Sequence, residues 1–145
     1  MKRILVAIDG SPTSEQALRE AREVAEKEQA EVKIMTVITH ASAYAYAYTP
    51  ALNNSFEEEA VKNAKKVLAE AEKVFEGYPG KVESVQVHGD AASMIIQQVE
   101  NDLPDLLVIG SRGMGGFQRL ILGSTVSKVL NHVCCNILVV RQCEI

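Results

Sequence analysis

The sequence predicts an α/β protein built on a doubly wound parallel sheet of five strands, and two patterns support this prediction. Five short apolar runs recur along the chain, each of the length of a buried strand. Four intervening segments repeat their apolar residues with the period of a helix. Such alternation is typical of parallel sheets with helices on both faces. Because 145 residues fit one domain, we expect a single domain over residues 1–145.

Two strands and two helices are expected in the N-terminal half. The runs at 3–8 and 31–38 predict strands. Ser11 is a candidate N-cap, and Pro12 suits the first position of the helix that follows. The segment Ser55-Phe56-Glu57-Glu58 has the pattern of a capping box, so we expect the second helix to begin there and to end at about residue 76.

The C-terminal half continues the same alternation. Strands are expected at 82–87, 105–109 and 137–140. A helix is expected at about 91–101, and a last helix carries Val126, Val129 and Val133 on one face. We find no internal repeat, linker or second domain in the sequence.

Charge and composition exclude several classes of protein. The formal net charge is −4, so no basic surplus exists to neutralise a nucleic-acid backbone. The first apolar run, Ile4 to Ile8, is shorter than a secretory signal or a membrane span requires, and no later run is longer. The three cysteines include no CxxC pair, so they do not indicate zinc or dithiol chemistry. We therefore expect a cytoplasmic protein without membrane insertion and without nucleic acid as a partner.

An alternating Ala-Tyr segment at 43–48 stands apart from this pattern. It is consistent with a loop that carries aromatic rings to a partner or over a site. It is equally consistent with a connection whose tyrosines pack against the protein.

Glycines and hydroxyl residues follow two of the predicted strands. Asp9-Gly10-Ser11 ends the first strand, and the glycine-rich segment 110–116 ends the fourth. Gly123-Ser124-Thr125 then begins the last helix. In an open parallel sheet, ligands bind beyond the carboxyl ends of the strands. Backbone near glycine can approach a phosphate closely, and a helix N-terminus with hydroxyl residues favours an anion. These segments predict a nucleotide site.

Two familiar phosphate-binding motifs do not match this site. No Lys-Ser or Lys-Thr pair follows a glycine loop, which excludes a P-loop. Gln118 stands where a dinucleotide fingerprint would place its third glycine, so a dehydrogenase is not indicated.

The spacing that remains is Gly110-x2-Gly113-x9-Gly123-Ser124, together with an aspartate at the end of the first strand. With these features the chain resembles the universal stress protein family, specifically its ATP-binding branch, over essentially its whole length. The resemblance implies a Rossmann-like fold related to that of the adenine nucleotide alpha hydrolases, whose last strand is used for dimerisation.

The resemblance also implies roles for individual residues. Asp9 would face the ribose or a magnesium ion. Arg112 could reach the phosphates or could be solvated. The other nucleotide-binding positions would be Ala7 and Val37 at the adenine, Ile109 and Gly110 along the ribose, and Gly113, Gly123, Ser124 and Thr125 around the phosphates. One departure concerns the approach to the last strand, where the family usually has prolines and this chain reads Val133-Cys134-Cys135-Asn136.

The function implied is a regulatory module in the stress response that binds ATP with Mg²⁺, forms a homodimer and acts on an unidentified regulatory protein partner. Two alternatives stay open. One is an ATP hydrolase, which we expect to be slow because Asp9 is the only carboxylate near the predicted site. The other is a dimeric chaperone-like protein that needs no nucleotide, which would leave the glycine spacing unexplained.

Overall fold

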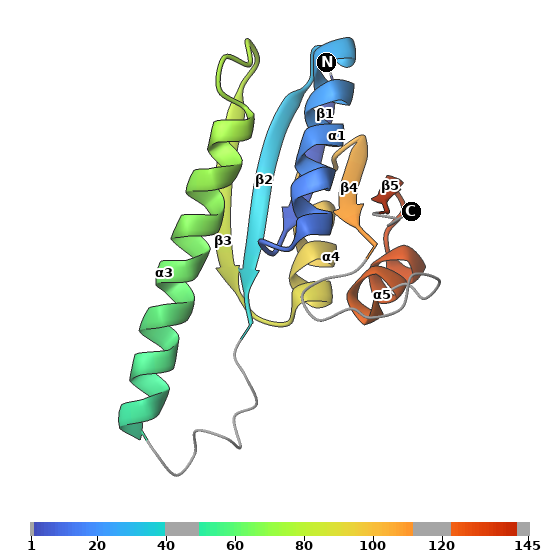
Figure 1. Ribbon diagram of the computed structural model, residues 1–145. Helices are drawn as coiled ribbons and strands as arrows, with labels where there is room; N and C mark the ends of the chain where they lie inside the picture. The colour runs from blue at the N-terminus through green and yellow to red at the C-terminus, as the bar shows by residue number, and fades with distance from the viewer. Residues whose placement is uncertain (1, 40–49, 112–122, 142–145) are drawn as a thin grey trace.

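A five-stranded parallel sheet in the order β3-β2-β1-β4-β5 forms the centre of the molecule (Figure 1). This computed structural model describes residues 2–39, 50–111 and 123–141, and only the backbone of 50–56. The strands are β1 (Arg3–Ile8), β2 (Glu31–Ile38), β3 (Val82–His88), β4 (Leu106–Gly110) and β5 (Asn136–Val140). The chain winds from β1 outward to β3 and then returns to the other side of β1, as a doubly wound sheet does.

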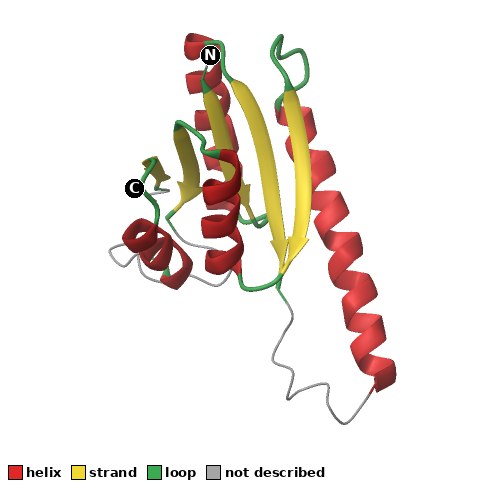
Figure 2. Ribbon diagram, turned by 180° about the vertical axis from the view of Figure 1, so that it is seen from behind, coloured by secondary structure: helices red, strands yellow, loops and turns green. Residues whose placement is uncertain are grey.

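Helices cover both faces of this sheet. Figure 1 shows α1 and α3 in front of it, and Figure 2, seen from behind, shows α4 and α5 on the opposite face. The helices are α1 (Pro12–Glu28), α3 (Pro50–Val74), α4 (Ala91–Asp102) and α5 (Ser124–His132). The N-terminal part of α3 extends past the carboxyl ends of the strands (Figure 1). The predicted α/β class and the doubly wound sheet are confirmed.

The two faces of the sheet bury two separate apolar clusters, because successive side chains of a strand point to opposite faces. Val6 and Ile34 belong to the cluster under α1 and α3, and both are fully buried. Leu5, Met35 and Leu107 belong to the cluster under α4 and α5 and are also fully buried. Strands β1 and β4 read as continuous apolar runs in the sequence, which is why they could be recognised there.

The predicted element boundaries hold within one residue except at one helix. Ser11 is the N-cap of α1, as predicted, and its hydroxyl accepts a hydrogen bond from the amide of Ser14 at 3.2 Å. The expected start of the second helix at Ser55 is wrong, since α3 begins at Pro50. Proline is well suited to a first helical position, where its missing N–H would have no partner in the helix. The capping-box pattern at 55–58 therefore lies inside the helix.

Candidate functional site at the carboxyl ends of the strands

All five strands end at the same edge of the sheet, which we call the carboxyl edge. The chain crosses from one half of the sheet to the other between β1 and β4, which pair directly, with Ala7 opposite Ile109. This is the point at which open α/β sheets bind ligands. The fold therefore brings Asp9, which follows β1, and Gly110, the last residue of β4, to the same edge of the sheet.

Asp9 stands at the carboxyl edge, immediately after β1, and is exposed. Its Oδ1 atom accepts a hydrogen bond from the amide of Ser11 at 2.9 Å, and its own amide donates to the Ser14 hydroxyl at 3.3 Å. Gly10 completes the turn with a φ of +85°, a conformation that residues with a Cβ rarely adopt. The turn thus holds a carboxylate at the switch point, as the sequence predicted.

Gly110, the last residue of β4, packs against the N-terminus of α1. A Cβ atom here would lie 2.8 Å from Thr13 Cγ2 and 3.1 Å from the Thr13 carbonyl carbon. The structure therefore explains this glycine by the close approach of helix and strand, a reason that its place in the phosphate motif did not reveal. The predicted contact of Gly110 with a ribose stays a prediction.

Ser111 fixes the start of α5 at the same edge. Its amide donates to the Val140 carbonyl of β5 at 2.8 Å, and its own carbonyl accepts from the amide of Gly123 at 2.9 Å. Ser111 is almost completely buried. Ser111 was not among the predicted site residues, although its position between Gly110 and Gly113 was a signal that could have indicated it.

Gly123 is the N-cap of α5, and the helix begins at Ser124. The first-turn amides of a helix have no acceptor within the helix. In the part of the chain that the structure describes, no side chain caps this turn. Ser124 is exposed and Thr125 is half-buried. These amides and hydroxyls lie at a positive helix end, an arrangement that favours a phosphate or another anion.

Three predicted adenine and ribose positions lie together on the sheet face under α4 and α5. Ala7 and Ile109 pair in register, and Val37 lies in β2, two residues beyond the partner of Ala7. Ala7 and Ile109 are buried and Val37 is half-buried. Apolar surface at a strand end suits the flat face of a base. Of the remaining predicted positions, Arg112 and Gly113 lie outside the described residues, as does the Ala-Tyr segment at 43–48.

A link between α4 and α5 was not anticipated from the sequence. Asp90, the N-cap of α4, accepts hydrogen bonds from the Ser93 amide at 3.0 Å and the Ser93 hydroxyl at 2.8 Å. These two bonds, the hydroxyl bond first, lower the pKa of Asp90 below its usual value. The ammonium of Lys128 on α5 lies 3.5 Å from the same carboxylate.

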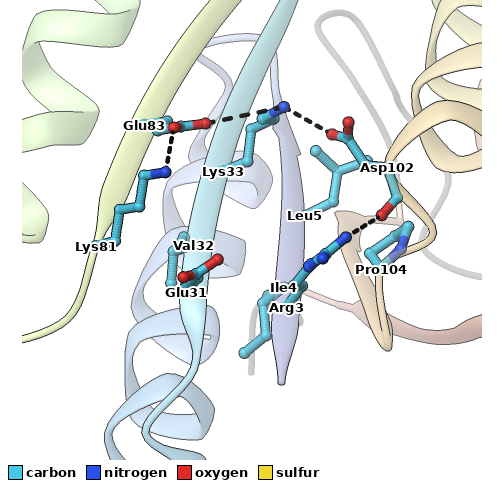
Figure 3. Close-up of a pocket in the computed structure, with 10 residues that line it drawn as sticks. All are labelled: Arg3, Ile4, Leu5, Glu31, Val32, Lys33, Lys81, Glu83, Asp102 and Pro104. Atoms are coloured by element: carbon cyan, nitrogen blue, oxygen red, sulfur yellow. Dashed lines mark hydrogen bonds and ion pairs between the residues drawn. The ribbon is translucent and has the colours of Figure 1, made fainter. Parts of the chain in front are cut away.

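A hollow of about 250 Å³ lies at the opposite end of the strands from the carboxyl edge (Figure 3). Four of its charged side chains form ion pairs: Lys33 contacts Asp102 at 2.8 Å and Glu83 at 3.9 Å, and Lys81 contacts Glu83 at 2.9 Å. The Arg3 guanidinium donates to the Asp102 carbonyl at 2.9 Å. These pairs hold the C-terminal end of α4 against the sheet, far from the carboxyl edge.

Neither a cluster of metal ligands nor a membrane-spanning helix is present among residues 2–39, 50–111 and 123–141. They contain no group of three or more His, Cys, Asp or Glu side chains that could hold a metal ion by themselves. No described helix has the length and apolar character that crossing a membrane requires.

The fold and the carboxyl edge define a doubly wound α/β protein with an anion-favouring helix end at its switch point. The sequence profile of the universal stress protein family matches residues 1–141. The chain belongs to this family. Universal stress protein YxiE of Bacillus subtilis is 32% identical over 145 residues, covering 96% of this chain and 98% of the relative. Universal stress protein A homolog 2 of Coxiella burnetii is 34% identical over 141 residues, covering 97% and 94%.

Solved structures confirm the fold. Universal stress protein UspA from Lactobacillus plantarum superposes with a TM-score of 0.86 at 25% identity, covering 97% of both chains. A universal stress protein in complex with cAMP has a TM-score of 0.72 at 24% identity, again covering 97% of both chains. The universal stress protein from Archaeoglobus fulgidus in complex with dAMP has a TM-score of 0.71 at 18% identity, covering 97% of this chain and 98% of that one.

Proposed function

We propose that this universal stress protein binds an adenine nucleotide at the carboxyl edge, that the nucleotide is ATP with Mg²⁺, and that the bound state regulates a protein partner. The observation that carries the proposal is the N-terminus of α5, which the hydrogen bond from Gly123 to Ser111 anchors at the end of β4. Among the described residues no side chain caps its first-turn amides, which could bind phosphate oxygens, and Asp9 follows the adjacent strand β1. Two relatives of the same fold hold the adenine nucleotides cAMP and dAMP, which supports the choice of base.

The residues at the edge fit such a ligand. Asp9 would accept hydrogen bonds from the ribose or coordinate the metal ion, Ala7, Val37 and Ile109 would border the base and sugar, and Ser124 and Thr125 would hold the phosphates. Arg112 and Gly113 are assigned to the phosphates by the same proposal. One carboxylate is sufficient for Mg²⁺ here, because this ion is commonly bound by one or two carboxylates together with phosphate oxygens and water.

Binding without rapid turnover is the form of this proposal that the described carboxylates favour. Hydrolysis needs a group that orients or deprotonates water. Asp90 accepts hydrogen bonds from the amide and hydroxyl of Ser93, and Asp9 is assigned to ribose or metal. Among the described residues of the edge, no further aspartate or glutamate ends a strand or begins α5. A nucleotide-dependent regulatory module therefore suits the site better than an ATP hydrolase.

The proposal includes a homodimer formed through β5, and a place in the cytoplasm. Strand β5 is an edge strand of the sheet, and Ile137, Leu138 and Val139 are only partly buried. An edge strand has backbone N–H and C=O groups on its outer side that can pair with another strand. A second copy of β5 would cover it.

The nucleotide is tested by denaturing the purified protein, identifying any released nucleotide by chromatography, and titrating the protein with Mg-ATP in a calorimeter. We expect the released nucleotide to be intact ATP, or the titration to give a saturable heat of binding without release of phosphate. Steady phosphate release would show a hydrolase instead. If no nucleotide is released and no heat of binding is detected, the proposed function is refuted, although the fold is unaffected.

A further inference from the structure

The side chain of Lys128 bridges the two helices on the rear face of the sheet at the carboxyl edge. Its Nζ atom lies 3.5 Å from Asp90 Oδ2 and 3.4 Å from the Ser93 hydroxyl, both long contacts for an ammonium group. Half of the Lys128 side chain is exposed. The ammonium is therefore held loosely, next to the site proposed for phosphates.

Asp90 does not need this lysine for its role as the cap of α4. The same Oδ2 atom already accepts the shorter hydrogen bonds of the Ser93 amide and hydroxyl, at 3.0 Å and 2.8 Å. These bonds satisfy the helix end by themselves. Lys128 can leave Asp90 while the local structure of α4 stays intact.

The position of Lys128 along α5 places it within reach of the proposed phosphate site. It follows Ser124 by four residues, so the two side chains lie on the same face of the helix. Four residues of helix rise about 6 Å. Long helical side chains lean toward the N-terminus of their helix, and the four-carbon stem of lysine is flexible. Its ammonium can thus move along the helix toward the first turn of α5.

We infer that Lys128 exchanges Asp90 for the outer phosphates of a bound nucleotide, and that it thereby makes the site prefer a nucleoside triphosphate to a monophosphate. The inference rests on the proposed function. A monophosphate carries its charge next to the ribose, whereas the outer phosphates of ATP extend further and can take a lysine as partner. Phosphate is the stronger acceptor, since it carries more charge than the carboxylate that it replaces.

The test is a calorimetric comparison of AMP, ADP and ATP, at constant Mg²⁺, with wild-type protein and three variants of the site. Lys128→Met removes the charge and keeps the length, Lys128→Arg keeps the charge, and Asp90→Asn keeps a capping side chain but releases the lysine. Lys27→Met changes an exposed lysine in the last turn of α1 and serves as the matched control.

We expect Lys128→Met to weaken ATP binding about tenfold, the size of one hydrogen bond to a charged group, and AMP binding by less than about twofold. Lys128→Arg and Lys27→Met should keep the wild-type ratio of ATP to AMP affinity. Asp90→Asn should bind ATP at least as tightly as wild type.

Two results would overturn the inference while the nucleotide site stands. One is an equal loss for AMP and ATP in Lys128→Met, or no loss. The other is a weakened ATP affinity in Asp90→Asn, which would show that the ion pair only holds α5 in place. If wild-type protein binds no nucleotide at all, the proposed function fails first and the inference fails with it.

Discussion

The carbonyl oxygen of Ser111 and the amide of Gly123 are joined by a hydrogen bond of 2.9 Å, so the end of β4 holds the beginning of α5. The same Ser111 donates its amide to Val140 of β5 at 2.8 Å. One residue therefore fixes two elements that follow it in the chain. This contact sets where the positive end of α5 lies relative to β1 and β4.

Gly123→Val is expected to remove nucleotide binding and leave the fold intact. Gly123 has a φ of −62° and a ψ of 158°, which valine also adopts, so only the less favourable N-cap should cost about 1 kcal/mol of unfolding free energy. The branched side chain would occupy the space in front of the first-turn amides. We expect ATP affinity to fall at least about hundredfold.

Calorimetry and urea unfolding of this variant measure the two effects separately. Gly113→Val, in the same motif, should behave in the same way. A folded Gly123→Val protein that binds ATP as tightly as wild type would refute the phosphate site at α5.

Two substitutions of Asp9 separate the effect of its negative charge from its hydrogen bond within the turn. Asparagine retains an oxygen that can accept from the Ser11 amide, whereas alanine loses this bond. We expect Asp9→Asn to keep the hydrogen bond from the Ser11 amide and to lose the Mg²⁺ dependence of ATP binding. Asp9→Ala should show the same loss and also lower the unfolding free energy by about 1 kcal/mol. ATP titrations of both variants with and without Mg²⁺ measure this effect. If both variants respond to Mg²⁺ as wild type does, Asp9 does not bind the metal ion.

The fold was predictable because local signals agreed with tertiary structure. Strands covered on both faces appear as uninterrupted apolar runs, and Ser11-Pro12 gives an unambiguous helix start. The start of α3 could not be predicted in this way. Two helix-start signals, Pro50 and the pattern at 55–58, lie five residues apart there, and nothing local decides between them.

The site was predictable only as far as it follows strand ends. Asp9 and Gly110 come together because neighbouring parallel strands end at the same edge. The contact of Gly110 with Thr13 and the pairing of Lys128 with Asp90 join residues from distant parts of the sequence. Spacing rules describe neither contact, because each depends on how helices dock on the sheet. Both became visible in the three-dimensional structure.

Gly110→Ala tests the docking of α1 on β4. The added Cβ would lie 2.8 Å from Thr13 Cγ2 and 3.1 Å from the Thr13 backbone, so helix and strand must separate. We expect a loss of about 1–3 kcal/mol in unfolding free energy, as in other overpacked sites, and weaker nucleotide binding. Gly77→Ala is the control, because that glycine has a φ of +79° and no atom within 4 Å of its added Cβ. Gly77→Ala should lower stability through backbone strain and leave nucleotide affinity unchanged.

Asp102 should make stability depend on pH. Burial acts to raise the pKa of this carboxyl, but hydrogen bonds from Lys33 and Gln98 outweigh it, and the pKa is lowered. A lowered pKa stabilises the folded state above the unfolded value, near 4, and this stabilisation is lost as the pH falls through the folded value. Asp102→Asn should therefore cost about 1 kcal/mol at pH 7, and the difference should shrink below about pH 4.

Urea unfolding at several pH values measures this effect. Glu100→Gln, which changes an exposed carboxylate two residues earlier on α4, is the control. It shows how the loss of one negative charge alone changes the unfolding free energy. A difference between Asp102→Asn and wild type that stays constant down to pH 3 would contradict the assignment of the ion pair.

Val139→Pro is expected to separate a β5-mediated dimer without unfolding the protomer. The Val140 carbonyl accepts a hydrogen bond from Ser111, so the polar groups of Val140 face β4. Because these groups alternate along a strand, the amide of Val139 points away from β4, to the side on which the proposed second copy of β5 would pair. Proline is tolerated at such an outward edge position but prevents further pairing.

Leu138→Pro is the matched control, since it removes an amide that faces β4 and should destabilise the protomer itself. Light scattering should show wild type as a dimer and Val139→Pro as a folded monomer. A dimer that survives Val139→Pro would place the interface on another surface.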